Sequence, residues 1–150
     1  MNEFSIGDKV ISNCTFEGIK NDDIIPGVAS NFASLGWLKI RKEKLIKQPE
    51  YFSNEEAACF SLGGQTAYSM IRKSGILESQ TKNPIVFSSK SATSLFIIQV
   101  LKHFGIDPVC CTSDVWSKEE IEKLGVKTII SVNQIDQYSD SFTHVFDPFF

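Results

Sequence analysis

The feature that most constrains the fold is an alternation of strand-like and helix-like segments over residues 83–147. Short apolar runs typical of buried strands occur at 83–88, 107–112, 127–131 and 144–147. Two segments with helical periodicity, 94–105 and 117–125, separate the first three of these runs. Strands joined by helices of this length pair in parallel. The sequence therefore predicts an α/β fold with a partial doubly wound parallel sheet of about four strands.

Residues 1–52 have a different pattern of apolar and polar residues, which predicts a β-rich region. Partial alternation of apolar and polar residues predicts strands at 8–12, 36–40 and 43–49. The pattern changes to helical after this region, so we predict two domains, 1–52 and 53–150.

A helical segment opens the second region. Ser53 and Glu56 form a capping-box pattern, and Gly75 follows two basic residues at the other end, as is typical of a helix C-terminus. Gly63 and Gly64 predict a break into two helices.

Composition excludes several classes of partner. The chain has 15 basic and 18 acidic residues, a net charge of -3 and no basic block, which disfavours nucleic acid and anionic membranes. There is no apolar run of about 18 residues, and an acid at position 3 argues against a signal peptide. We expect a cytoplasmic location.

The four cysteines lack the spacing of metal ligands. Cys110 and Cys111 are adjacent in a predicted strand, so they should point to opposite faces of the sheet. We expect all four, including Cys14 and Cys59, to be reduced core residues.

The turn at residues 87–94, “FSSKSATS”, holds the main candidate site. In a doubly wound sheet this first turn between strand and helix presents free N–H groups and a partial positive charge to an anion. Ser89, Ser91 and Ser94 fall on the three glycine positions of the GxGxxG dinucleotide pattern. The candidate phosphate-binding residues are Ser89, Lys90, Ser91, Ala92, Thr93 and Ser94.

Serine in place of glycine weakens or reshapes such a site without removing it. Positive φ at Ser89, where the tight turn would need it, costs on the order of 1 kcal/mol, and the side chain of Ser91 crowds the approach of a pyrophosphate. The helix dipole survives these changes, and Lys90 adds a charge suited to phosphate. The alternative is an ordinary serine-rich N-cap that binds nothing.

Five segments of the chain stand in a characteristic order. They are “FSIGDKV” (4–10), “EKLIKQPEYFSNEEAACFSLGGQTAY” (43–68), “PIVFSSKSATSLFIIQVLKHFG” (84–105), “KLGVKTII” (123–130) and “HVFD” (144–147). In this order they resemble the medium-chain dehydrogenase/reductase superfamily, especially its zinc-independent quinone oxidoreductase-like and enoyl reductase-like members. The resemblance implies a remnant of a GroES-like catalytic domain at 1–52 and a partial Rossmann domain at 53–150.

The sequence departs from the family pattern in its length and in its lack of zinc ligands. Family members are much longer, so we expect a chain truncated at both ends. Leu62 stands where zinc-dependent relatives carry a cysteine ligand, and Cys14 has no neighbouring cysteine, so no zinc is expected.

The resemblance also implies roles for individual residues. Thr66 would approach the nicotinamide end of a cofactor, and Ser89 to Ser94 would face its pyrophosphate. Thr112 and Ser113, together with Lys118, suit the 2′-phosphate of NADPH, so NADPH is favoured over NADH. Asp114 limits this preference, because it could bind a ribose or repel that phosphate.

The resulting hypothesis is an NADPH-dependent oxidoreductase that transfers hydride to a carbonyl or activated double bond of a small molecule, with no catalytic residue named. The alternative is a non-catalytic relic or interaction module that binds no dinucleotide, with an open sheet edge covered by a second copy or a complementing chain. A Rossmann-like domain for another adenosine ligand is a third hypothesis.

Three further residues have ordinary structural explanations. His103 ends an apolar helix and is expected near its C-terminus rather than in catalysis, and His144 starts a strand. Asp147 either lines the cofactor cleft or opens a turn before Pro148.

Overall fold

The computed structural model describes residues 4–12, 42, 45–138 and 140–149. The chain forms two compact units, Met1–Gln65 and Thr66–Phe150. The domain boundary predicted after residue 52 stays a prediction. Within the described ranges, no helix is both long and apolar enough to cross a membrane.

The first unit contains a small antiparallel sheet. Strand β1 (Val10–Ser12) pairs with β2 (Leu45–Lys47), and Ile11 lies opposite Ile46. These strands confirm the predictions at 8–12 and 43–49. The predicted strand at 36–40 and Cys14 lie outside the described residues.

The helical segment begins and breaks where the sequence predicts. Helix α1 (Asn54–Cys59) starts at a complete capping box between Ser53 and Glu56. A π-helical turn (Phe60–Gly64) follows, and α2 (Gln65–Ser74) continues to a left-handed Gly75 with φ +74°. The glycines at the break favour this turn because they lack the side chain that would otherwise pack against the preceding helical turn.

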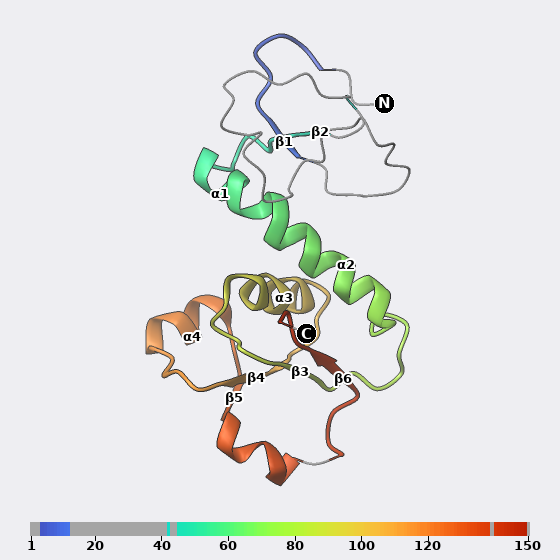
Figure 1. The fold of residues 1–150 in the computed structure, drawn as a ribbon, viewed down its shortest axis with the longest axis vertical. Coiled ribbons are helices and arrows are strands. Elements are labelled where there is room, and N and C mark those ends of the chain that lie inside the picture. Colours follow the sequence, from blue (N-terminus) through green and yellow to red (C-terminus); the bar gives the residue numbers. More distant parts are fainter. Residues whose placement is uncertain (1–3, 13–41, 43–44, 139, 150) are drawn as a thin grey trace. The chain divides into compact units, whose positions relative to one another are not determined.

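The second unit is a parallel sheet with its connecting helices (Figure 1). Its elements are β3 (Pro84–Val86), α3 (Ala92–His103), β4 (Val109–Thr112), α4 (Lys118–Leu124), β5 (Thr128–Ser131), a 3-10 helix (Val132–Tyr138) and β6 (His144–Phe146). The four strands lie in the order β5-β4-β3-β6, and every neighbouring pair is parallel. The predicted four-stranded parallel sheet is confirmed.

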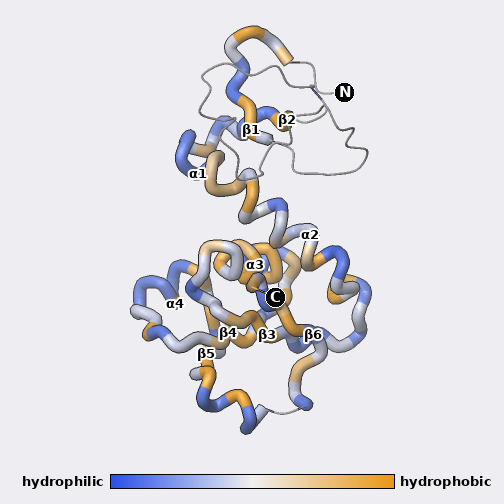
Figure 2. Tube along the Cα trace, viewed as in Figure 1, coloured by the Kyte–Doolittle hydropathy of each residue, from blue (hydrophilic) through white to orange (hydrophobic). Residues whose placement is uncertain are grey.

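Strand register divides the core into two layers. Cys110 lies opposite Val86 and Ile129, and its row packs with α2 and α3 in one apolar cluster. The next row along β4 and β5 faces the other way, and there Cys111 and Ile130 share a second cluster with Ile85. The strands and α3 form the apolar centre of the unit in Figure 2.

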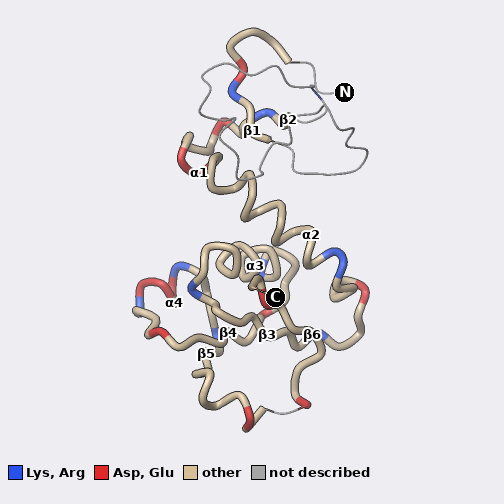
Figure 3. Tube along the Cα trace, in the orientation of Figure 1, with Lys and Arg blue, Asp and Glu red and all other residues tan. Residues whose placement is uncertain are grey.

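Fewer residues pack against the second face of the sheet than against the first, which α2 and α3 cover. The 3-10 helix and the segment after it contribute Ile135, Tyr138 and Phe142 to this face. The sequence predicts no helix at 132–138, because a seven-residue helix with few inward side chains has no measurable apolar period. Charged residues lie around the rim of the unit, with many on α4 (Figure 3).

Candidate functional site

Strand order places the candidate site at the carboxyl end of β3. The chain runs from β3 outward through β4 to β5 and then crosses back to β6 on the other side of β3. The order therefore reverses between β3 and β6. In open α/β sheets, ligands bind in the crevice beyond the carboxyl ends of the strands at such a switch point. The turn at 87–94 leaves the sheet there and leads into α3.

Backbone strain in this turn falls on Ser88. Its φ is +45°, in the left-handed region that favours glycine. Ser89, the first of the glycine-like positions, does not have a positive φ, so the predicted strain at Ser89 is wrong by one residue. Ser89 lies in the turn beyond β3, and its N–H donates to the carbonyl of Cys111 on β4 at 3.1 Å.

The hydroxyl groups of Ser91 and Ser94 are used inside the turn. Ser91 is the N-cap of α3, and its Oγ accepts a hydrogen bond from the N–H of Ser94 at 3.2 Å. Ser94 is fully buried, and its Oγ donates to the carbonyl of Phe87 at 2.8 Å. These serines close the turn by side-chain bonds that glycines cannot make.

Ser89 differs from the other two serines. Its side chain is fully buried, and its Oγ has no hydrogen-bond partner among the described residues. Ala92 and Thr93 form the first turn of α3 beside it. A buried hydroxyl without a partner carries a desolvation cost of about 1–3 kcal/mol, which sets Ser89 apart from the two bonded serines.

Lys90 extends away from its own turn toward the loop after β4. Its Nζ lies 3.0 Å from the Oε1 atom of Glu120 and donates to the carbonyl of Val115 at 3.0 Å. The ammonium also lies 5.9 Å from the ring centroid of Trp116. The structure therefore joins the predicted phosphate turn to the predicted ribose loop through one side chain.

The loop after β4 holds the other predicted residues. Thr112 is buried at the end of the strand, and its Oγ1 accepts from the N–H of Asp114 at 3.0 Å. Ser113 and Asp114 are exposed, and so is Lys118, the first residue of α4. Thr66 is exposed on α2, and no described hydrogen bond links it to the turn.

Glu120 is a site residue that the sequence analysis misses. It is the third residue of α4, and its carboxylate completes a capping box with Ser117 as well as pairing with Lys90. Hydrogen bonding from the backbone of Ser117 and then from Lys90 lowers the pKa of Glu120 to about 2. The capping pattern was visible in the sequence, but a pairing across 30 positions was not.

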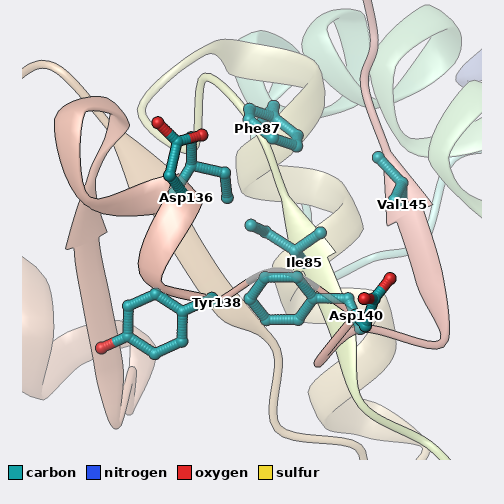
Figure 4. Close-up of a pocket in the computed structure, with 8 residues that line it drawn as sticks. Ile85, Phe87, Asp136, Tyr138, Asp140 and Val145 are labelled. Carbon is teal, nitrogen blue, oxygen red and sulfur yellow. The ribbon is translucent and has the colours of Figure 1, made fainter.

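A cavity of about 380 Å³ lies on the lightly covered face of the sheet (Figure 4). Apolar residues of β3, β6 and the crossover line most of it, and Asp136 and Asp140 contribute carboxylates. None of the predicted cofactor-binding residues lines this cavity. The candidate site is therefore built from the turn and the loop at the strand ends.

The cysteines follow their predicted placement in part. Cys110 and Cys111 are buried on opposite faces of the sheet, which confirms the prediction, and burial raises the pKa of Cys110 to about 12. Cys59 is exposed, so its predicted place in the core is wrong: it ends α1, whose one buried residue among those described is Ala57. In the described part of the chain, no three His, Cys, Asp or Glu side chains gather as a metal site.

The three remaining candidates have structural roles. His103 is the last residue of α3, and its ring packs edge-on against Phe104. The Nδ1 atom of His144 lies 2.9 Å from the hydroxyl of Thr143. Asp147 accepts a hydrogen bond from the N–H of Phe149 at 3.0 Å, which is the turn-opening arrangement.

Comparisons with known proteins relate this arrangement to oxidoreductases. No family model matches the chain. It is 23% identical over 146 residues to crotonyl-CoA reductase from Streptomyces avermitilis, covering 89% of this chain and 33% of that protein. The chain thus spans about a third of the length of the curated relative it matches.

Two solved structures show the same fold. The quinone oxidoreductase of Thermus thermophilus, whose complex with NADPH is known, aligns with a TM-score of 0.53 at 20% identity, over 68% of this chain and 34% of that one. A cinnamyl alcohol dehydrogenase from Sorghum bicolor aligns with a TM-score of 0.60 at 17% identity, over 71% and 31%.

The parallel sheet, its strand order and the turn before α3 define a Rossmann-like α/β fold. In its ordered sequence motifs and in its similarity to crotonyl-CoA reductase, the chain resembles the medium-chain dehydrogenase/reductase superfamily.

Proposed function

We propose that this chain binds a nicotinamide dinucleotide at the turn between β3 and α3 and serves an NADPH-dependent oxidoreductase. The observation that carries the proposal is the position of this turn, at the carboxyl end of β3 and beside the reversal of strand order. The turn opens a helix of 12 residues, long enough for its N-terminus to attract an anion.

The residues of the turn fit a pyrophosphate. The buried Ser89 Oγ has a donor and acceptor to offer, since it has no partner among the described residues. Ser91 and Ser94 fix the turn by their own hydrogen bonds, so the backbone N–H groups at the start of α3 are held in place before a ligand arrives. Thr66 is proposed at the nicotinamide end.

Preference for NADPH over NADH is proposed from the loop after β4. Exposed Ser113 and Lys118 offer a hydroxyl and a cation, and the ammonium of Lys90 lies against the same loop. Asp114 is exposed and makes no ion pair in the described part of the chain, so its charge opposes a 2′-phosphate. The preference for NADPH therefore depends on whether attraction of the 2′-phosphate by the two lysines exceeds its repulsion by Asp114.

The dinucleotide, when bound, would supply a hydride for a carbonyl or an activated double bond of a small molecule. The residues of this chain would bind and orient it: the turn would hold the phosphates and the loop after β4 would hold the ribose. No side chain near the turn is assigned proton transfer, and we propose no zinc in the reaction. A small-molecule substrate and a cytoplasmic location, which suits the free thiols of Cys110 and Cys111, complete the proposal.

We also propose the division into a partial GroES-like domain at 1–52 and a partial Rossmann domain at 53–150. The capping box at Ser53 supports this boundary, because it marks where the helical region begins.

Titration with NADPH and with NADH, followed by tryptophan fluorescence, tests the proposed function. Trp116 is buried beneath Lys90 and so reports on the loop. We expect saturable quenching by both dinucleotides, with tighter binding of NADPH. A Ser89→Leu variant should lose this binding, whereas Ser79→Ala, a change at a hydroxyl in the turn after α2, should not. No quenching by either dinucleotide up to millimolar concentration would overturn the proposal.

A second candidate, an interaction module that binds no dinucleotide, is favoured by one observation. Strand β6 lies at the edge of the described sheet, and Val145 on it is 64% exposed. An exposed edge strand can pair with a strand of another chain, either a second copy or a complementing polypeptide. Sedimentation of the chain alone, together with an absence of dinucleotide binding, would favour this candidate if it revealed a stable dimer.

A further inference from the structure

Lys90 and Glu120 form an ion pair at the loop after β4. Lys90 is the one basic residue in the turn at 87–94, and its Nζ lies 3.0 Å from Oε1 and 3.2 Å from Oε2 of Glu120. A third contact, 3.0 Å to the carbonyl of Val115, fixes the ammonium on the loop. The side chain of Lys90 is 28% exposed, so a ligand at the loop can still approach it.

The pair has no net charge. A free ammonium at this position would attract a phosphate, whereas an ammonium held by a carboxylate presents a dipole whose negative end lies on α4. Glu120 remains ionised over the whole physiological range because its pKa is lowered to about 2, first by the backbone of Ser117 and then by Lys90. Its side chain is 41% exposed, so water screens its charge and an effect on an anion at the loop is a severalfold one at most.

The capping role of Glu120 can be separated from its charge. The capping box needs an acceptor at the third helical position, and glutamine provides one as well as glutamate does. Glu120→Gln therefore keeps the hydrogen bond from the N–H of Ser117 and removes one negative charge beside Lys90.

We propose that Glu120 is a specificity-determining residue that limits affinity for a 2′-phosphorylated dinucleotide by neutralising Lys90. This inference rests on the proposed function and deepens it by naming the residue that balances NADPH against NADH. The 2′-phosphate is the group concerned, because it is the one feature that distinguishes the two dinucleotides. Glu120 acts through Lys90 and is not a contact to the reacting atoms.

Dissociation constants for NADPH and NADH, measured on the full chain and three variants, test the inference. Glu120→Gln should tighten NADPH binding about fivefold and leave NADH within twofold, as expected for removal of one like charge near the protein surface. Lys90→Met should weaken NADPH binding by a similar factor and weaken NADPH more than NADH. The matched control is Glu119→Gln, which removes the neighbouring charge on the same helical turn.

The outcomes separate the inference from the proposed function. If Glu120→Gln tightens binding of NADPH alone and Glu119→Gln does not, the result supports both the inference and the proposed function. An equal change for the two dinucleotides, or an equal gain in the control, overturns the specificity role while dinucleotide binding stands. Failure of the wild-type chain and of Glu120→Gln to bind either dinucleotide overturns the proposed function and this inference together. Thermal unfolding of each variant shows whether the fold is retained.

Discussion

The hydroxyl of Ser94 donates to the backbone carbonyl of Phe87 across 2.8 Å, from the first turn of α3 back to the end of β3. Ser94 is fully buried, so Ser94→Ala would leave this carbonyl without its partner. We expect a loss of about 1–2 kcal/mol in the free energy of unfolding, measured by urea titration. Ser79→Ala is the control, because the hydroxyl of Ser79 makes a similar bond to Thr81 in an exposed turn. Equal losses in the two variants would contradict the role of burial.

Replacing Ser88 by glycine should stabilise the chain. Its φ of +45° is a conformation that glycine adopts without strain, whereas a side chain costs about 1–2 kcal/mol there. Part of this gain is offset by the greater freedom of glycine in the unfolded state, so about 0.5–1 kcal/mol should remain. Ser91→Gly, at a position with φ −70°, should instead cost a few tenths of a kcal/mol through the lost cap. A lower melting temperature for Ser88→Gly would show that the turn is not strained there.

Alkaline pH should destabilise the fold through Cys110. Burial raises the pKa of its thiol from 9.0 to about 12, so in the unfolded chain the thiol ionises at lower pH than in the folded one. The unfolded state then binds fewer protons, and stability falls as pH rises from about 9 toward the folded pKa, by up to about 1.4 kcal/mol per pH unit. Urea titrations between pH 8 and about 10.5 measure this slope. Cys110→Ala should be less stable at neutral pH but should have a shallower alkaline slope, and an unchanged slope would contradict the assignment.

Asp107 joins two elements of the sheet unit through ion pairs. Its Oδ1 lies 2.7 Å from Lys102 at the end of α3, and its Oδ2 lies 2.6 Å from Lys127 just before β5. Because the carboxylate is 41% exposed, Asp107→Asn should cost only about 0.5–1 kcal/mol.

The cost of Asp107→Asn should depend on pH. Hydrogen bonds from Lys102 and then Lys127 lower the pKa of Asp107 below 3.8, so the wild-type advantage is present above about pH 4 and is lost as pH falls through the folded pKa. Thermal melts at neutral and at acid pH would measure the difference. Asp114→Asn, at an exposed carboxylate outside these ion pairs, is the control variant.

The sequence predicts the sheet well because burial on both faces leaves a strong signal. Val86 and Cys110 lie in continuous apolar runs, and parallel strands of this kind need no alternation. The capping boxes at Ser53 and Ser117 are local patterns within four residues, so both helix starts are predicted correctly. The 3-10 helix at 132–138 is missed, because its short polar sequence resembles a loop.

The candidate site is harder to predict because its contacts are not local. Spacing alone places the glycine-like pattern at Ser89, but the residue with positive φ in this turn is Ser88, and the N–H of Ser89 bonds to the neighbouring strand. The position of Lys90 in the turn predicts that it binds phosphate. Its ion pair with Glu120 depends on how α4 packs, which the sequence does not show.

The adjacent thiols of Cys110 and Cys111 lie in separate apolar layers, one beneath α3 and one beneath the 3-10 helix. Exposure of each of these two thiols therefore depends on a different local opening of the fold. A reagent that reaches Cys111 has passed through the lightly covered layer, and one that reaches Cys110 has required α3 or its neighbours to move. The reaction rates of these two consecutive thiols therefore report separately on the local opening of each face of one sheet.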